Sequence, residues 1–451
     1  MMGRLFGTDG ARGIANTELT CELAMQIGRA AAVVLTKETA HKPKIVIARD
    51  TRISSEMLES ALAAGLCSVG ANAVILGVIP TPAASYLVSR YGADAGVMIS
   101  ASHNPVEYNG IKLFASTGYK LPDALEEQIE ELILDHPEKI ERKSGTELGR
   151  ISVCHTAVQD YISHLLSKMD VNLSGMAVAL DCANGSASAT ARAVFSRLGA
   201  EVHMLNDHPD GTNINKNCGS THMDALARYV AETPGLIGGF AFDGDADRCL
   251  AVDENGCRID GDQIIAAFAR QMKAENRLSA DTAVVTVMSN FGMRDFGRRE
   301  GVRIVQTAVG DRYVLEEMLK NSYNLGGEDS GHIILSDYAN TGDGQLTALQ
   351  MLRICKKTGK PLSEIASAMQ KSPQVLRSVR ASAEDKKRYM QIPAVADVIR
   401  EAEEALGEDG RVLVRASGTE PLIRVMLEGS DAAKIETYCT KICKTIEENI
   451  G

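Results

Sequence analysis

Three aspartates at alternate positions carry the strongest chemical signal in the sequence. Asp243, Asp245 and Asp247 follow the apolar segment Leu236–Phe242, and in extended backbone alternate side chains point to one side. Carboxylates this close repel one another unless a cation lies between them. Oxygen ligands with no neighbouring His or Cys favour Mg²⁺ or Ca²⁺ over zinc. The trio therefore predicts a site for a hard divalent cation.

The same segment has two alternative interpretations. With Asp243 at position 1, Glu254 falls at position 12 of an EF-hand loop. However, Arg248 occupies position 6, where the sharp turn needs Gly, and Leu236–Phe242 is strand-like rather than helical. A solvated acidic turn is the other alternative. Mg²⁺ with open positions for a substrate phosphate fits the segment better than either.

Ser102 lies in a polar loop, Ser100–Pro105, directly after the strand-like segment Gly96–Ile99. The loop lacks the GxSxG elbow of a hydrolase, and the sequence offers no obvious acylation triad. A lone loop serine is usually structural. Beside a magnesium site, however, a serine hydroxyl is what phosphoryl transfer requires, so we expect Ser102 to act together with the aspartates.

Two further segments could bind anions. Gly7–Gly13 offers backbone N–H groups and Arg12, although it is not a P-loop because GxxxxGK[ST] is missing. Arg415–Pro421, followed by Arg424, combines hydroxyls, a glycine turn and two guanidinium groups. This second set suits a dianionic phosphate, and a plain hairpin turn is its alternative interpretation.

Short apolar strands alternate with helix-period segments along three stretches of the chain. The predicted strands are Lys44–Ala48, Ala73–Leu76 and Gly96–Ile99, then Ala177–Leu180, Glu201–Leu205 and Leu236–Phe242, then Ala283–Val287, Arg303–Val305 and Ile333–Leu335. Helices are predicted at Cys21–Leu35, Ser55–Val69 and Ala83–Tyr91. This alternation indicates βαβ units with mostly parallel sheets. Because ligands bind beyond the carboxyl ends of such strands, we expect the Ser102 loop, the aspartate loop and Gly326–His332 to face a shared cleft.

The final stretch has a different pattern. Strands are predicted at Val375–Val379, Arg411–Val414 and Leu422–Leu427, with a helix near Val395–Leu406 and a terminal helix. Two strands so close in sequence indicate an antiparallel sheet, hence an α+β domain. The predicted domains are 1–150, 151–253, 254–370 and 371–451, with a hinge near Lys371–Pro373.

Composition excludes several classes of protein. The net charge of −11, an aromatic content of 4% and the lack of Trp argue against a nucleic-acid partner. Residues 62–79 are apolar but contain three glycines and Asn72, so no membrane span is expected. Ten cysteines show no metal-binding or disulfide spacing. We expect a soluble, cytoplasmic protein whose cysteines pack in its core.

Taken in order, the five motifs resemble the signature set of the α-D-phosphohexomutase superfamily over essentially the whole chain. The similarity is greatest to the bacterial branch that acts on glucosamine phosphates. The resemblance implies three similar mixed α/β domains and a C-terminal α+β domain around a central cleft. It also implies an enzyme of the isomerase class, an intramolecular phosphotransferase.

The same resemblance implies a role for individual residues. Catalytic roles are implied for Ser102 as the phosphoserine, His103, Lys112, Arg12, Arg248 and His332. Metal ligation is implied for Asp243, Asp245, Asp247 and an oxygen of the phosphorylated Ser102. Substrate contacts are implied for Glu328, Ser330, Arg415, Ser417, Gly418, Thr419 and Arg424.

The implied reaction interconverts glucosamine 6-phosphate and glucosamine 1-phosphate, in support of UDP-N-acetylglucosamine synthesis. It uses one Mg²⁺ per chain, phosphorylated Ser102 and a sugar 1,6-bisphosphate as intermediate and activator. Glucose or mannose phosphates are the alternative substrates, since Asp329 stands where the glucosamine branch usually carries Gln. A sensor without activity and a phosphatase fit less well, and the sequence leaves open whether the chain forms a homodimer.

Overall fold

The computed structural model describes residues 4–7, 9–37, 39–417 and 421–450. The chain divides into two compact units, Met1–Met288 with Val302–Ala368, and Ser289–Gly301 with Met369–Gly451. The larger unit contains three mixed sheets flanked by helices, and the smaller unit contains one antiparallel sheet. The α/β fold class and the α+β character of the C-terminal part are therefore confirmed.

The first sheet has seven strands in the order β1-β2-β6-β5-β3-β4-β7. Their bounds are β1 (Phe6–Gly7), β2 (Gly10–Ile14), β3 (Lys44–Arg49), β4 (Asn72–Val78), β5 (Ala95–Ile99), β6 (Tyr108–Ala115) and β7 (Ile151–Val153). Strands β3, β4, β5 and β7 pair in parallel, whereas β1, β2, β6 and β5 pair antiparallel. Both Ser102 and Lys112 therefore belong to the β5–β6 region of this sheet.

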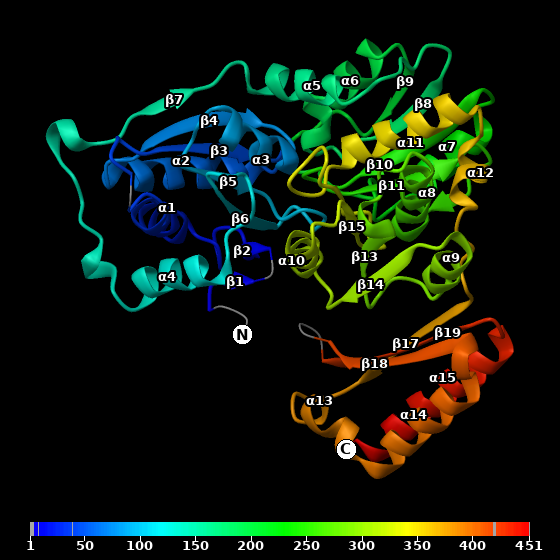
Figure 1. Ribbon diagram of the computed structural model, residues 1–451. Helices are drawn as coiled ribbons and strands as arrows, with labels where there is room; N and C mark the ends of the chain where they lie inside the picture. The colour runs from blue at the N-terminus through cyan, green and yellow to red at the C-terminus, as the bar shows by residue number, and fades with distance from the viewer. Residues whose placement is uncertain (1–3, 8, 38, 418–420, 451) are drawn as a thin grey trace. The chain divides into compact units, whose positions relative to one another are not determined.

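Alternation along the central strands divides the two faces of this sheet. On β3, Ile45 and Ile47 join a core with α1 (Cys21–Leu35), α2 (Ile53–Ser68) and α4 (Asp123–Leu134). On the other face Gly96 leaves room for Val88 of α3 (Thr81–Arg90), because a Cβ there would lie 2.2 Å from that side chain. Figure 1 shows this part of the chain in blue to cyan. Helix α3 is thus packed closely against the start of β5.

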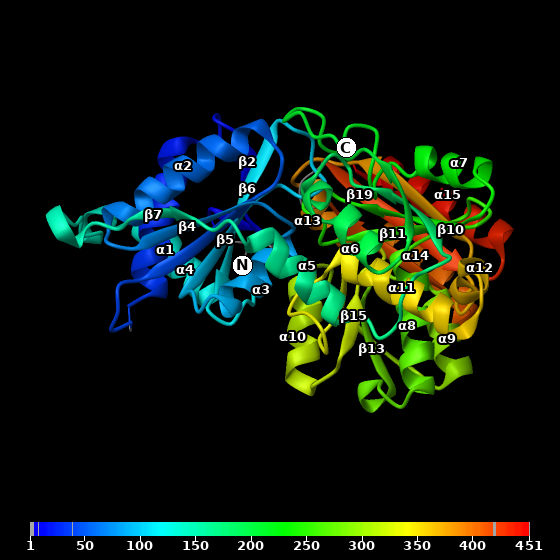
Figure 2. The same cartoon turned by 90° about the horizontal axis from the view of Figure 1, so that it is seen from above.

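The second sheet has the order β12-β11-β10-β8-β9. Its elements are β8 (Ala177–Asp181), β9 (Glu201–Leu205), β10 (Leu236–Phe242), β11 (Cys249–Asp253) and β12 (Arg258–Ile259), with α5 (Ala157–Ser167), α6 (Ala191–Arg197) and α7 (Asp224–Glu232). Strands β10 and β11 form an antiparallel pair in which Phe242 lies opposite Cys249. The aspartates occupy the loop that joins these two strands. Helix α5 also meets α3 of the first sheet (Figure 2), where the rings of His164 and Tyr86 stack with centroids 3.8 Å apart.

The third sheet has the order β14-β13-β15-β16. Its elements are β13 (Thr282–Thr286), β14 (Arg303–Thr307), β15 (Leu325–Gly327) and β16 (Ile333–Leu335), with α8 (Gly261–Ala274), α10 (Asp311–Asn321), α11 (Gly344–Thr358) and α12 (Leu362–Ala366). Asp260 and Gln263 form a capping box at the start of α8. The tight β15–β16 pair places Glu328 to His332 at its turn.

The smaller unit contains the sheet β17-β19-β18. Its elements are β17 (Gln374–Arg380), β18 (Gly410–Ala416) and β19 (Leu422–Gly429), with α9 (Gly292–Glu300), α13 (Asp385–Arg388), α14 (Pro393–Leu406) and α15 (Ala432–Asn449). Buried Ile423, Val425 and Leu427 of β19 pack against α14 and α15. Cys439 and Cys443 lie in this core, as their helical spacing predicts.

The prediction of mostly parallel sheets is wrong for the first and second sheets, in each of which parallel and antiparallel pairings are equal in number. In the first sheet the sequence pattern did not predict β2 and β6. Strand β6 carries a glycine and a buried lysine, Gly110 and Lys112, so its apolar alternation is interrupted. Two short strands also lie past the predicted domain limits. Strand β7 pairs with β4 beyond residue 150, and β12 pairs with β11 beyond residue 253. Strands of two or three residues give no readable periodicity.

Candidate active site

Ser102 is buried where the loop after β5 meets the aspartate loop. Its side chain is 1% exposed, and its Oγ donates a 2.5 Å hydrogen bond to Oδ2 of Asp243. The close approach depends on Gly244, where a Cβ would lie 2.6 Å from the carbonyl oxygen of Ser102. The sequence therefore brings a nucleophilic hydroxyl into contact with the predicted cation ligands.

The three aspartates form a compact cluster. Each is at most 3% exposed, and one ligand oxygen from each lies within 4.8 Å of the others. Burial, together with repulsion from Asp247 and Asp245, raises the pKa of Asp243 well above its usual range. Glu254, the last position of the hypothetical EF-hand, instead accepts a 3.2 Å hydrogen bond from the backbone N–H of Ser363. Because Glu254 is hydrogen-bonded to Ser363 and a strand, not a helix, precedes the aspartates, the EF-hand interpretation is wrong.

The donor set of this cluster fits a magnesium ion. One oxygen of Asp245, Oδ2, accepts hydrogen bonds from Lys112 Nζ at 2.8 Å and Thr81 Oγ1 at 2.5 Å. The other oxygen of Asp245, Oδ1, is buried and has no hydrogen-bond partner in the described part of the chain, and the same holds for Oδ1 of Asp247. Buried carboxylate oxygens without partners are costly. A hard cation bound by carboxylate oxygens removes that cost.

Lys112 balances part of the negative charge of the cluster. Its Nζ lies 2.8 Å from Asp245, 2.9 Å from Asp9 and 3.6 Å from Asp247. Burial lowers the pKa of Lys112, but these carboxylates outweigh burial and the pKa is raised. Lys112 is therefore held protonated beside the metal ligands.

His103 and two arginines lie on the Ser102 side of the cluster. Nδ1 of His103 is 3.1 Å from Nη1 of Arg248 and 3.4 Å from the Ser102 hydroxyl. Burial, with the charges of Arg248 and Arg12, lowers the pKa of His103 to about 4, so the ring is neutral and accepts from Arg248. The Nε–H groups of Arg248 and Arg12 are buried and have no partner among the described residues. Two N–H donors without partners suit the oxygens of a transferring phosphoryl group.

The β15–β16 turn adjoins the aspartate loop. His332 forms a backbone bridge with Arg248, and its Nδ1 lies 3.6 Å from Asp247. Glu328 Oε1 accepts a 3.1 Å hydrogen bond from the backbone N–H of Gly310, and burial raises the pKa of Glu328. The buried hydroxyl of Ser330 has no partner among the described residues. The turn thus presents polar groups with hydrogen-bonding capacity next to the aspartates.

The predicted phosphate clamp belongs to the smaller unit, on the β18–β19 hairpin. Arg415 lies directly opposite Arg424 in the ladder. Like charges in that relation are destabilising, so the hairpin suits an anion that binds both guanidinium groups. Ser417 is buried, and its N–H donates to Leu422 O at 2.9 Å. Gly418 and Thr419, also predicted here, lie outside the described residues.

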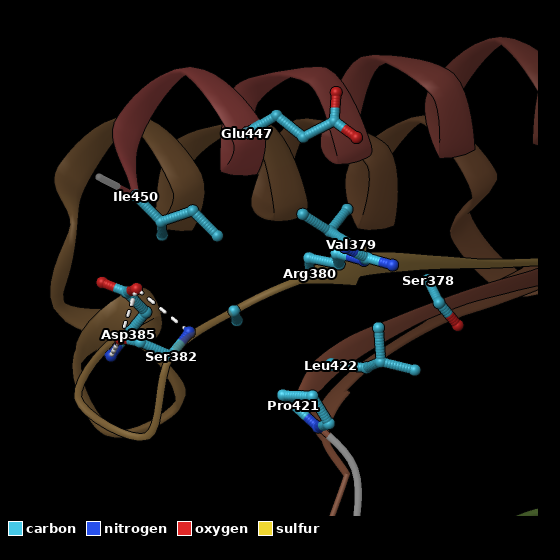
Figure 3. Close-up of a pocket in the computed structure, with 10 residues that line it drawn as sticks. Ser378, Val379, Arg380, Ser382, Asp385, Pro421, Leu422, Glu447 and Ile450 are labelled. Carbon is cyan, nitrogen blue, oxygen red and sulfur yellow. Dashed lines mark hydrogen bonds between the residues drawn. The ribbon is translucent and has the colours of Figure 1, made fainter.

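A separate hollow of about 900 Å³ lies in the smaller unit. Figure 3 shows it beside the end of β17 and the last turn of α15; the residues that line it are Ser378, Val379, Arg380, Ala381, Ser382, Asp385, Pro421, Leu422, Glu447 and Ile450. Its acidic residue Asp385 is already engaged, since Ser382 Oγ donates to Asp385 Oδ2 at 2.6 Å. Among the predicted site residues that the structure describes, none lines this hollow.

Comparison with known proteins identifies the fold and the family. Four domain families match the chain: phosphoglucomutase/phosphomannomutase alpha/beta/alpha domain I at residues 3–139, domain II at 159–256, domain III at 260–372 and the C-terminal domain at 378–445. The chain belongs to the phosphoglucomutase/phosphomannomutase family. The predicted superfamily and its isomerase class are therefore confirmed.

Relatives in this phosphohexomutase family match the chain from end to end. A phosphoglucosamine mutase of Acetivibrio thermocellus is 53% identical over 450 residues, covering 100% of both proteins. A phosphoglucosamine mutase of Clostridium botulinum is 56% identical over 449 residues, again covering 100% of both. Among solved structures, a phosphoglucomutase/phosphomannomutase family protein from Burkholderia thailandensis has a TM-score of 0.81 at 23% identity, covering 100% of this chain and 99% of its own.

A second solved structure carries ligands. The Aspergillus fumigatus N-acetylphosphoglucosamine mutase, determined with GlcNAc-6P and magnesium, has a TM-score of 0.69 at 17% identity and covers 99% of this chain and 96% of its own. At 17% identity this similarity shows a shared fold and nothing beyond it. No helix in the described part of the present phosphohexomutase is long and apolar enough to cross a membrane.

Several charged residues that sequence reasoning did not single out extend the site of this phosphohexomutase. Lys120 Nζ lies 2.6 Å from Asp9 and also pairs with Asp311. Asp311 in turn lies 3.5 Å from Nε2 of His332. Asp9 stands inside the Gly7–Gly13 motif, so its position was a usable signal. Lys120 and Asp311 had no comparable sequence context.

Proposed function

We propose that this phosphohexomutase interconverts glucosamine 6-phosphate and glucosamine 1-phosphate, with Ser102 as the carrier of the phosphoryl group. One observation supports this most strongly: the 2.5 Å hydrogen bond from Ser102 Oγ to a buried aspartate cluster, two of whose oxygens have no partner among the residues that the structure describes. The choice of an amino sugar rests on relatives that are 53% and 56% identical over the whole chain.

The aspartates would hold one Mg²⁺ per chain, together with an oxygen of phosphorylated Ser102. The ion would supply positive charge to the phosphoryl oxygens and so stabilise the transferring group. Arg248 and Arg12, whose buried Nε–H groups have no partner among the described residues, would donate hydrogen bonds to the same phosphoryl oxygens. His103, neutral and hydrogen-bonded to Arg248, holds that guanidinium beside Ser102.

In the forward step the bond from phosphorus to Ser102 Oγ breaks, and a bond from phosphorus to the free sugar hydroxyl forms. The proton that the sugar hydroxyl loses ends on Ser102 Oγ, and Lys112 relays it through its Nζ. The product of this half-reaction is a sugar 1,6-bisphosphate. In the second half-reaction the other phosphoryl group of the bisphosphate is transferred to Ser102, so the phosphorylated enzyme is regenerated. Because the bisphosphate can phosphorylate Ser102, it also serves as activator.

Two anion sites are needed because the bisphosphate has to reverse its orientation between the half-reactions, so that each of its phosphates occupies the reacting position once. We assign the non-reacting phosphate to Arg415, Ser417, Gly418, Thr419 and Arg424. Two directly opposed arginines support this assignment. Glu328 and Ser330 would bind sugar hydroxyls, and His332, paired with Asp247, would orient the metal ligand from the sugar side.

Intact mass spectrometry with and without Ser102→Ala tests the carrier directly. After incubation with glucose 1,6-bisphosphate, the wild-type chain should gain the mass of one phosphoryl group, and Ser102→Ala should gain none and lose turnover. Ser89→Ala, an exposed serine of the same domain, is the matched control. A fully active Ser102→Ala variant would refute the mechanism.

Side-by-side rates with glucosamine, glucose and mannose 6-phosphates test the sugar. The alternative is a phosphoglucomutase or phosphomannomutase, which Asp329 in the sugar turn leaves open. We expect glucosamine 6-phosphate to give the highest kcat/KM. Dominance of a neutral sugar would overturn that choice while leaving the serine carrier intact.

A cytoplasmic location and the oligomeric state complete the proposal. All ten cysteines are free, and seven of the cysteines in the larger unit are buried or partly buried. Free, covered thiols suit a reducing compartment. A homodimer stays a prediction, and sedimentation of the purified chain decides it.

A further inference from the structure

Arg52 is a buried charged residue that the proposed mechanism does not use. It precedes α2, is 1% exposed, and its Nε donates to Asp50 Oδ2 at 2.9 Å. Its Nη2 donates to the backbone oxygens of Ser102 at 2.9 Å and Asn104 at 2.8 Å, and its Nη1 donates to Pro105 O. Each nitrogen of the guanidinium is thus engaged by protein oxygens, so Arg52 is placed to shape the Ser102 loop rather than to bind substrate.

Asp50 connects the same ion pair to the amide of the nucleophile. Its Oδ2 accepts a 2.7 Å hydrogen bond from Ser100 Oγ, and that hydroxyl oxygen accepts a 3.0 Å hydrogen bond from the N–H of Ser102. The N–H and the C=O of Ser102 are therefore both held by a network that begins at the Asp50–Arg52 pair.

Asn215 approaches the same two carbonyl oxygens from the second domain. Its Nδ2 donates to Ser102 O at 2.8 Å and to Asn104 O at 3.1 Å. The side chain is 7% exposed, and its backbone has φ +57°. Two buried donors from different domains thus converge on one pair of acceptors.

The backbone of Ser102 needs such support. Its φ of +52° lies in the left-handed region, which is unfavourable for residues other than glycine and persists only where the surroundings impose it. A carbonyl that relaxed toward ordinary dihedrals would turn the Oγ of Ser102 away from Asp243.

We propose that Asn215 and Arg52 are positioning residues that fix the left-handed conformation of Ser102 and thereby aim its oxygen at the aspartate cluster. The inference rests on the proposed function of Ser102 as carrier. If so, catalysis depends on hydrogen bonds to the backbone carbonyl of Ser102 as well as on the groups that contact its side chain. A displacement of about 1 Å at a reacting atom can cost about 100-fold in rate.

Asn215→Gly tests this with little strain, because glycine adopts φ +57° readily. Asn217→Gly is the matched control, since Asn217 lies in the same loop with φ +55° and an exposed side chain. We expect kcat of Asn215→Gly to fall about tenfold or more, with KM within about twofold of wild type and slower phosphorylation of Ser102 by glucose 1,6-bisphosphate. Asn217→Gly should match wild type in all three. Equal kcat values for the two variants would overturn the proposal.

Two further variants guard against an ambiguous result. Asn215→Asp places a carboxylate against two carbonyl oxygens and should lower kcat more than Asn215→Gly does. Arg52→Lys cannot reproduce the fork of hydrogen bonds and should reduce kcat further still. If Asn215→Gly lowers kcat and raises KM by similar factors, and its Tm falls by a large amount, Asn215 has only a structural role and the proposal fails. If wild type itself does not convert glucosamine 6-phosphate, the proposed function fails, and the rate of Ser102 phosphorylation still decides the positioning claim.

Discussion

The aspartate loop and the β18–β19 hairpin both gather like charges, but in different environments. Asp243, Asp245 and Asp247 are buried, and Lys112 lies within 3.6 Å of two of them. Arg415 and Arg424 face each other across the hairpin and remain partly exposed.

The difference matches the two kinds of ligand that we assign. A resident cation can be met by buried charges whose balance is built into the fold, because it does not have to leave during turnover. A substrate phosphate has to arrive and depart, so its arginines stay in contact with water. Four changes test this contrast, in order of decreasing expected effect on free energy.

Lys112→Met should have the largest effect. Without this cation the carboxylates of Asp9, Asp245 and Asp247 lose a shared buried partner, and breaking such a pair costs about 3–5 kcal/mol of stability. We expect a lower Tm without Mg²⁺, and a larger rise in Tm on adding Mg²⁺ than wild type shows. The exposed Lys444→Met is the control, and an unchanged Tm response to Mg²⁺ would show that Lys112 does not balance the cluster.

Asp243→Asn should weaken Mg²⁺ binding and turnover by about 100-fold or more, since even an outer partner of a metal ligand contributes about 10- to 100-fold. Titration calorimetry with Mg²⁺ and steady-state rates measure the two effects separately. Asp397→Asn, on the exposed face of α14, is the matched control. Wild-type affinity in Asp243→Asn would remove this residue from the metal site.

Arg415→Gln should raise KM about 10-fold or more while kcat falls less, because a hydrogen bond to a charged group contributes about 1.5–3 kcal/mol and the clamp binds substrate and transition state alike. Steady-state kinetics with glucosamine 6-phosphate measure both constants. The exposed Arg400→Gln controls for charge. A fall in kcat alone would place Arg415 in the reacting part of the site.

Ionic strength should give the smallest effect. Salt screens exposed charges more than buried ones, so KM should rise about two- to threefold between about 0.05 and 0.3 M monovalent salt. Arg415→Gln should flatten that rise. If the KM of wild type does not change with salt concentration, the arginines of the clamp are as little screened by solvent ions as the buried aspartate loop.

Much of the secondary structure could be predicted because strong apolar segments such as Leu236–Phe242 coincide with strands. The aspartate cluster followed from spacing, since alternate positions after a strand share one side. Strand β6 escaped because Gly110 and Lys112 interrupt its apolar pattern.

The charged extension of the site could not be foreseen from local sequence. Lys120 and Asp311 are 191 residues apart, and the topology of two different sheets brings them together. Arg52 and Asn215 belong to the same class, because nothing near either residue indicates that it binds the Ser102 loop.

The most direct test of the central claim follows the phosphoryl group itself. Wild-type enzyme labelled with ³²P on Ser102 is mixed with an excess of unlabelled glucosamine 6-phosphate, and the products are separated after a single turnover. The account predicts that the label leaves the protein and appears in the sugar phosphates, with little inorganic phosphate. Label that stays on the protein, or that is released only as inorganic phosphate, would contradict it.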